Sequence, residues 1–247
     1  MILFVFEGVK REPALFQYLK TIYRIEGEVI CTYQSSLHSL YKEMREFDLD
    51  LVMLLREHLH KNNDHTLDKY DQSSQFSEVY LFFDYDFHDK KIELEQLNAE
   101  IREMLDFFKE ETDNGKLYIN YPMVESILYT KTLPDTQYSN YVISREDSHN
   151  FKNIASQFSD YHDYFFLSPF TQQDRENINA KHNWELLKRQ NVQKANYVCN
   201  GENDLPTREQ DISQSNIFIS QLNKYVIPYN QVAILNSFPL FVYEYFK

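Results

Sequence analysis

Glycine is scarce in this chain of 247 residues, where only Gly8, Gly27, Gly115 and Gly201 occur. Four glycines at these separations cannot form the GxGxxG fingerprint of a dinucleotide site or the GxxxxGK[ST] loop of an ATPase. The sequence therefore excludes both of these nucleotide-binding motifs. Any ATP hydrolysis linked to the function would have to come from a separate protein.

Cysteine is also rare, and its placement bears on compartment and metal binding. Cys31 and Cys199 form no CxxC pair, and the eight scattered histidines complete no zinc pattern with them. His58 and His60 diverge on a helix and make no metal pair. The N-terminal residues MILFVFE lack the basic region of a signal peptide, and no apolar run reaches the roughly 18 residues of a membrane span. We therefore expect a soluble protein in the reducing cytoplasm.

Positive charge is the third shortage. Lys and Arg number 25 against 38 Asp and Glu, a formal net charge of −13, so the average field repels a polyanion. A nucleic-acid substrate would need divalent ions, a basic strip or a partner protein. The most basic stretch, 181–194, includes Trp184 and predicts either a phosphate or acidic-partner contact or a solvated helix face. Its basic residues are Lys181, His182, Lys188, Arg189 and Lys194.

Apolar segments and helical patterns alternate over the first 135 residues. The strands are expected at 2–6, 28–33, 78–83 and 116–120, and the helices from Glu12, at 36–45, at 48–61 and at 92–108. This alternation predicts an α/β fold with a mostly parallel, four-stranded sheet flanked by helices. After residue 135 the alternation is lost, and we expect 136–247 to form a mainly helical extension, with helices within 149–196 and another beginning at Ser237.

Acidic residues follow three of the expected strands. Glu7 ends the first, Asp84 and Asp86 end the third, and Glu125 follows the fourth after a turn, in an expected helix. Ligands of open α/β sheets bind at the carboxyl ends of the strands, and two aspartates in an extended 84–86 segment would point to the same side. Such carboxylates suit Mg²⁺ or Mn²⁺. The alternative is that each acid is a helix cap or lies in a solvated turn.

Three segments together resemble the motifs of Toprim domains. FVFEGVKREPALFQYLK resembles the first motif, and its Glu-Gly with Glu12 is especially similar to the OLD-family and RloB-like nucleases of bacterial phage defence. YLFFDYDFHD resembles the DxD motif, and YPMVESILY resembles the segment after the fourth strand in RloB-like proteins, with Tyr121 where that family prefers Asn. The resemblance covers roughly residues 1–130.

The resemblance implies a Toprim-like metal-binding domain and a Mg²⁺- or Mn²⁺-dependent endonuclease. Glu7 would act as a metal ligand or general base, Asp84 and Asp86 as metal ligands, and Glu125 as a ligand or a more distant acid. Members of this kind commonly work with a partner ATPase in antiviral defence. The nucleic acid, whether DNA, tRNA or another RNA, stays open.

Three further residues are weaker candidates beside this set. Glu12 is either a site acid or a capping acid near the positive end of the helix dipole. Lys131 would either neutralise charge in the transition state or lie in solvent at a helix end. His88 would either reach the scissile phosphate or serve a structural or surface role.

Two other functions remain open from the sequence. A GT-A-type glycosyltransferase also carries a DxD motif at a strand end, where it binds a divalent ion and a nucleotide-sugar diphosphate, although it does not need Glu-Gly after its first strand. A catalytically inactive Toprim-like module that only binds a partner would suit the acidic, aromatic-rich chain. The four acids argue against the inactive module, because placing unpaired carboxylates together costs free energy that an inactive site has no need to bear.

Overall fold

A parallel sheet organises the molecule. The computed structural model describes residues 1–47, 49–158 and 174–246. The sheet has the strand order β2-β1-β3-β5-β4 and is built from β1 (Ile2–Phe6), β2 (Glu28–Thr32), β3 (Glu78–Asp84), β4 (Lys109–Glu110) and β5 (Gly115–Asn120). All pairings are parallel except that of β4 with β5. The predicted α/β class and mostly parallel sheet are confirmed, and β4 adds a fifth strand that the sequence pattern did not indicate.

β4 was missed because it is only two residues long and both of its residues are exposed. It lies between the end of α4 (Leu94–Phe107) and the glycine that begins β5, and it therefore carries no apolar run. The helical pattern predicted for 92–108 begins two residues later in the structure.

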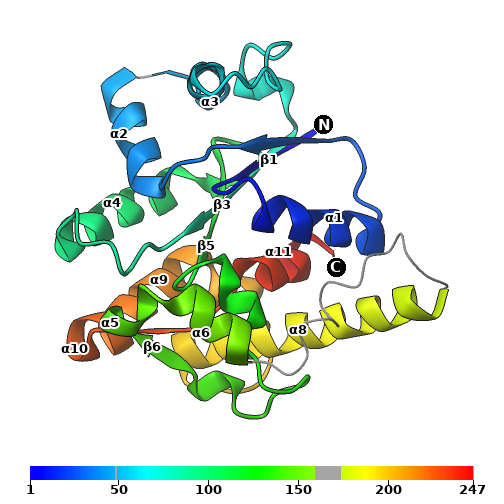
Figure 1. Cartoon of the computed structure of the whole chain (residues 1–247), viewed down its shortest axis with the longest axis vertical. Helices are drawn as coiled ribbons and strands as arrows, with labels where there is room; N and C mark the ends of the chain where they lie inside the picture. The colour runs from blue at the N-terminus through cyan, green and yellow to red at the C-terminus, as the bar shows by residue number, and fades with distance from the viewer. Residues whose placement is uncertain (48, 159–173, 247) are drawn as a thin grey trace.

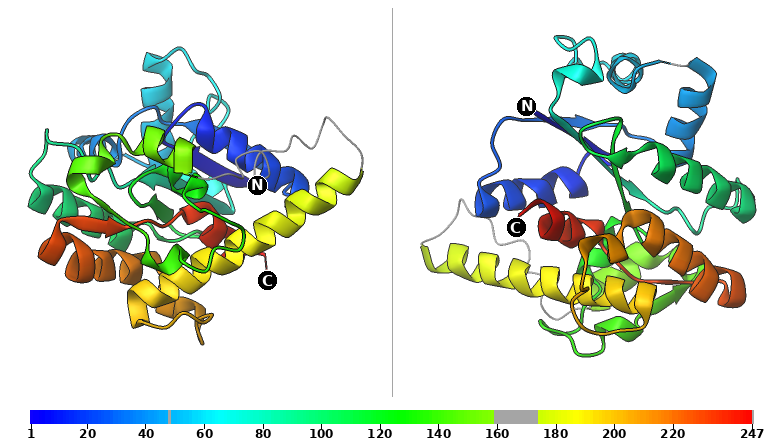
Figure 2. Two further views of the ribbon diagram at one scale, coloured as in Figure 1. Left: turned by 60° about the horizontal axis from the view of Figure 1, so that its bottom comes forward. Right: turned by 180° about the vertical axis from the view of Figure 1, so that it is seen from behind.

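Helices cover both faces of the sheet (Figures 1 and 2). On one face lie α1 (Arg11–Tyr23) and α11 (Ser237–Tyr245), and on the other lie α2 (Leu37–Phe47), α3 (Leu51–Lys61) and α4. This explains why β1 and the middle of β3 read as unbroken apolar runs, because both faces of a buried parallel strand need apolar side chains. The predicted helices at 36–45 and 48–61 are confirmed with shifted ends, and residue 48 lies outside the described part of the chain.

Aromatic rings fill the space between the sheet and α11. The Phe241 ring packs edge-on against Phe4, Phe82 and Tyr118, which come from β1, β3 and β5, with centroid distances of 5.6, 5.5 and 5.8 Å. Phe238 stacks on Phe82 at 4.6 Å. Helix α11, from the last part of the described chain, thus supplies side chains to the core that covers β1, β3 and β5.

The segment after residue 135 is largely helical but also contains a small sheet. In the described residues of this segment, the α-helices are α5 (Arg145–Ser148), α6 (Phe151–Phe158), α8 (Asp174–Asn200), α9 (Gln214–Gln221), α10 (Ile227–Tyr229) and α11. β6 (Val142–Ser144) pairs antiparallel with β7 (Gln231–Ala233). The helix start expected at Ser237 is confirmed, with Asn236 as its N-cap. The helical stretch predicted for 149–196 falls partly on residues outside the described part of the chain.

Candidate metal centre

The carboxyl ends of β1 and β3 bring two of the predicted acids together. β1 and β3 pair in parallel with Phe6 opposite Phe82, so Glu7 leaves its strand beside the end of β3. One carboxylate oxygen of Glu7 (Oε2) accepts a hydrogen bond from the backbone N–H of Asp84 at 2.8 Å. The expected neighbourhood of Glu7 and the DxD segment is therefore confirmed.

The second aspartate of the DxD segment is placed by a turn. β3 ends at Asp84, and Asp86 has a φ of 51°, in the left-handed region that aspartate tolerates better than most residues. The backbone N–H of Asp89 donates to the Asp86 carbonyl at 2.8 Å and closes the turn. The two aspartates were expected to point to the same side only if residues 84–86 were extended, and the structure does not meet this condition. Asp86 nevertheless lies close enough to raise the pKa of Glu7 by charge repulsion.

Asn120 is a site residue that the sequence analysis missed. It ends β5 opposite Asp84, and its amide Nδ2 donates to Asp84 Oδ1 at 3.0 Å. Its own Oδ1 accepts from the backbone N–H of Ser237 at 3.0 Å and from the Ser237 hydroxyl at 2.7 Å. The fully buried Asn120 thus connects the start of α11 to the acidic edge. The strand-end rule that selected the acids would have found it if amides had been included.

Glu12 closes the turn between β1 and α1. Its Oε1 accepts the backbone N–H of Gly8 at 3.1 Å, and its side chain is buried. A Cβ atom at position 8 would lie 2.8 Å from Glu12 Oε2, so a larger residue there would require the Glu12 carboxylate to shift. Glu12 lies in the first turn of α1, near the positive end of the helix dipole. The N–H that it accepts belongs to Gly8, which precedes the helix, so the contact holds the turn and is not a helix cap. Glu12 also lies close to the other acids.

Glu125 lies in a 3₁₀ turn, Val124–Leu128, and not in the α-helix expected there. Its Oε1 lies 3.6 Å from Arg11 Nε and 3.7 Å from Lys152 Nζ. Its Oε2 is buried and has no hydrogen-bond partner among the described residues. An unpaired buried carboxylate oxygen is costly, and it can be satisfied by a ligand that enters from this edge. Arg11 and Lys152 are the second and third site residues that the sequence analysis missed.

The acids share an environment that is partly to fully buried and that offers them few positive charges. Burial raises the pKa of Glu7 well above its usual range, and the Asp86 carboxylate raises it further. Burial followed by repulsion from Glu7 does the same to the pKa of Asp84, and burial also raises the pKa values of Asp86 and Glu12. The Lys152 ammonium lowers the pKa of Glu7, Glu12 and Asp86 and so partly opposes this trend.

The spacing of the acids limits how they could hold a cation. Within the described residues, no three of them place one carboxylate oxygen each within 4.8 Å of the others. A cation in this arrangement would have two protein carboxylates at most. That donor set fits Mg²⁺, which keeps several waters and commonly takes only one or two carboxylates beside substrate oxygens.

His88 and Lys131 differ in their relation to the acids. His88 lies near Asp86, whose pKa it lowers, and its buried Nδ1 has no hydrogen-bond partner among the described residues. Lys131 Nζ instead donates to the Phe158 carbonyl at 3.1 Å and lies over the Phe158 ring. The structure therefore gives the Lys131 side chain a contact with the end of α6.

The basic stretch 181–194 divides between core and surface. Trp184 and Lys194 are fully buried, and Lys194 Nζ donates to the carbonyls of Tyr138 and Tyr141 at 2.8 and 2.6 Å. Trp184 and Lys194 are therefore inaccessible to a phosphate, and the contact predicted for the stretch 181–194 cannot involve them. His182, Lys188 and Arg189 line a cavity of about 600 Å³ beside Phe246.

The comparisons with known proteins give no relative: no family model matches the chain, and no curated protein and no solved structure is significantly similar to it. Among the described helices, none combines the length and the apolar character needed to cross a membrane.

Proposed function

We propose that the chain is a Toprim-like, metal-dependent nuclease that hydrolyses phosphodiester bonds at the edge formed by Glu7, Asp84 and Asp86. One observation carries the proposal: these partly buried carboxylates lie together at the carboxyl ends of adjacent parallel strands, where desolvation and repulsion disfavour their charged forms. Gathering such groups costs stability unless a cation or a ligand compensates. A binding site for a cation would explain why these carboxylates are present despite the stability that they cost.

In this proposal two of the carboxylates of Glu7, Asp84 and Asp86 would hold a Mg²⁺ or Mn²⁺ ion through hard oxygen atoms, and the third would lie beside it. The ion would supply an activated water and stabilise the leaving oxygen. Asn120 keeps the Asp84 carboxylate oriented through its amide. Glu7 is fixed by the Asp84 backbone N–H through one oxygen, so its other oxygen is the one available to a ligand or to a proton of the attacking water.

Arg11 and Lys152 would bind the substrate phosphate. Both lie within 3.7 Å of the same Glu125 oxygen, and the Lys152 side chain is 73% exposed. An exposed ammonium near buried carboxylates can pair with a phosphate from solvent at little desolvation cost. These two cations would supply the local positive charge that a chain of net charge −13 otherwise lacks.

A separate ATPase partner and a role in antiviral defence belong to the same proposal. They rest on the motif resemblance and on the absence of any phosphate-binding glycine loop in the sequence. The experiment must therefore include the chain alone and the chain with any ATPase encoded beside it.

The test is a cleavage assay on the full chain with double-stranded DNA, single-stranded DNA and tRNA, in Mg²⁺, in Mn²⁺ and in chelator. We expect metal-dependent cleavage that Asp84→Asn or Glu7→Gln lowers by about a thousandfold, corresponding to about 4 kcal/mol of transition-state stabilisation. Asp113→Asn, which removes one charge from an exposed turn, should leave the rate unchanged and is the matched control.

Two results would contradict the proposal. Transfer of a sugar from a nucleotide-sugar donor without cleavage of any nucleic acid would favour the glycosyltransferase. The absence of both activities, together with a melting temperature that Mn²⁺ does not change in wild type or in Asp84→Asn, would favour a module that only binds a partner.

A further inference from the structure

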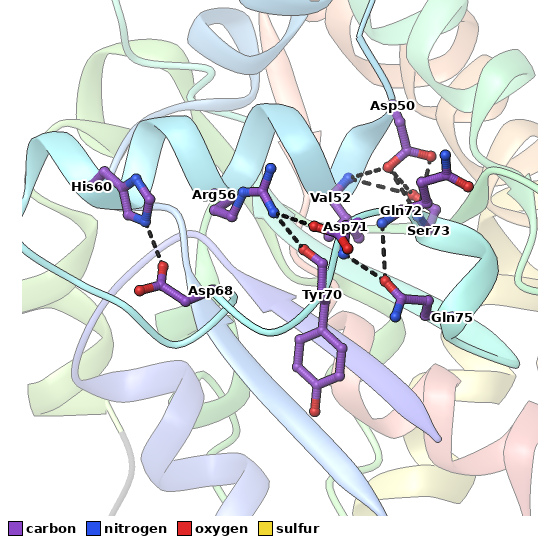
Figure 3. A network of polar contacts seen from close by, with 10 residues as sticks. All are labelled: Asp50, Val52, Arg56, His60, Asp68, Tyr70, Asp71, Gln72, Ser73 and Gln75. Carbon is purple, nitrogen blue, oxygen red and sulfur yellow. Dashed lines mark hydrogen bonds and ion pairs between the residues drawn. The ribbon is translucent and has the colours of Figure 1, made fainter.

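The loop that follows α3 folds back along this helix and is fixed to it at several points (Figure 3). At the start of α3, Asp50 Oδ1 accepts from the Val52 N–H at 2.9 Å and from the Ser73 hydroxyl at 3.0 Å. In the middle of the helix, Arg56 Nη1 donates to the Tyr70 carbonyl and to Asp71 Oδ1, both at 3.0 Å. The loop therefore has a defined position relative to the last turn of α3.

This position brings together three ligand-type side chains that the sequence separates. His60 Nε2 lies 2.5 Å from Asp68 Oδ1, and His65 Nδ1 lies 3.0 Å from Asp68 Oδ2. The two imidazole centroids are 5.2 Å apart. One ligand atom from each residue lies within 4.8 Å of the other two. Of the described His, Cys, Asp and Glu residues, no other three meet this condition.

The geometry and the chemistry of this cluster fit a transition metal. Zinc binds imidazole nitrogen and carboxylate oxygen at about 2.0–2.2 Å in a tetrahedron, which sets ligand atoms about 3.3 Å apart. The His60–Asp68 contact would have to open by less than about 1 Å to reach that spacing. Imidazole ligands favour Zn²⁺, Co²⁺, Ni²⁺ and Cu²⁺ over Mg²⁺, so this cluster differs in chemistry from the acidic edge.

We infer that His60, His65 and Asp68 form a binding site for a divalent transition metal, with zinc as the representative ion. The side chains are 45%, 61% and 48% exposed, so an ion can enter directly and water can occupy the fourth position. The bound ion would join the last turn of α3 to the loop and extend the contacts already made by Asp50 and Arg56. The proposal does not depend on the nuclease function.

The competing explanation is an ordinary surface cluster of ion pairs. The hydrogen bond with His60, together with the electrostatic attraction of both histidines, lowers the pKa of Asp68, and an ion-pair cluster accounts for this without a metal. Surface pairs of this kind contribute little to stability. The two explanations differ in one measurable respect, because only a metal site binds zinc with a fixed stoichiometry.

The test is calorimetric titration of the full chain with Zn²⁺ in excess Mg²⁺, with Co²⁺ absorption as a second readout. To remove any contribution of the acidic edge, each measurement is repeated in the Asp84→Asn background. We expect one zinc per chain in both backgrounds, a rise in melting temperature, and tetrahedral Co²⁺ bands. His65→Asn should abolish all three, while His149→Asn, at an exposed histidine elsewhere, should preserve them.

His65 is the most exposed of the three ligands, so His65→Asn should fold normally, and its circular dichroism should match that of the wild type. Zinc binding that His65→Asn leaves unchanged would overturn the inference, as would the absence of saturable binding at micromolar zinc. Because the readouts are zinc binding and melting temperature, failure here would leave the cleavage assay of the proposed nuclease unaffected.

Discussion

The Asn120→Ala substitution tests how the acidic edge depends on the C-terminal half of the chain. It removes the amide that donates to Asp84 Oδ1 at 3.0 Å and the carbonyl oxygen that accepts from Ser237 at 3.0 and 2.7 Å. Asn120 and Ser237 are fully buried, so water cannot readily replace these partners. The substitution therefore breaks a connection among β3, β5 and α11 at one point.

The expected cost follows from the individual contacts. A hydrogen bond to a charged group contributes about 1.5–3 kcal/mol, and a buried donor left without a partner costs about 1–3 kcal/mol. The Ser237 hydroxyl can rotate to another acceptor, whereas its backbone N–H cannot, and contributions of neighbouring groups do not add fully. We therefore expect Asn120→Ala to lower the free energy of unfolding by about 3 kcal/mol.

The assay is urea unfolding followed by circular dichroism at neutral pH in chelator. With an m-value of about 2–3 kcal/mol/M, a loss of 3 kcal/mol moves the midpoint down by about 1–1.5 M. Ser237→Ala, which removes only the hydroxyl contact, should cost about 1 kcal/mol. Asn216→Ala is the control, because Asn216 is exposed and its amide makes one bond to the Gln210 carbonyl. If Asn120→Ala stayed within about 0.5 kcal/mol of this control, the reasoning from the buried contacts would be refuted.

Two further predictions concern charge and packing. A raised native pKa means that the folded state holds its proton longer than the unfolded state, so the site loses stability as pH rises above the ordinary carboxyl range. In chelator, Asp84→Asn should therefore be more stable than the wild type at neutral pH, and this difference in stability should vanish on acidification. Thermal melts measured across pH test this. No difference from the wild type, or the same difference in Asp113→Asn, would argue against the reasoning. Phe241→Ala should lower the free energy of unfolding by about 3–5 kcal/mol, against less than about 1 kcal/mol for Phe107→Ala, whose ring is 47% exposed. Equal urea midpoints for the two variants would contradict the packing of α11 on the sheet.

The parts of the fold that depend on short segments could be predicted from the sequence. The apolar runs at 2–6 and 78–83 are buried on both faces, so each is recognisable without knowledge of its neighbours. Parallel pairing then places Glu7 beside Asp84 by topology alone. The same reasoning failed at Asp86, because a residue with positive φ after a strand leaves no trace in an apolar pattern.

The remaining site residues depend on contacts between distant segments. Lys152 reaches Glu125 from α6, and no periodicity in the sequence indicates where α6 packs. His60, His65 and Asp68 likewise show no recognisable zinc spacing, because their proximity results from a loop held by Arg56 and Asp50. Asn120 could have been found in part from the sequence, because the strand that it ends was predicted. It was missed because only acidic residues were considered at the strand ends.

The dependence of the core on α11 has a consequence for synthesis on the ribosome. Asn120 and Ser237 are separated by 117 residues, which at about 5–20 residues per second corresponds to roughly 6–23 s of translation. During that interval the aromatic face of β1, β3 and β5 lacks the Phe241 ring that packs on it. A nascent chain therefore exposes an apolar, aggregation-prone surface of the kind that chaperones bind. Its acidic edge is completed only when α11 has emerged. A half-made chain accordingly lacks the complete acidic edge, to which the nuclease activity is only proposed to belong.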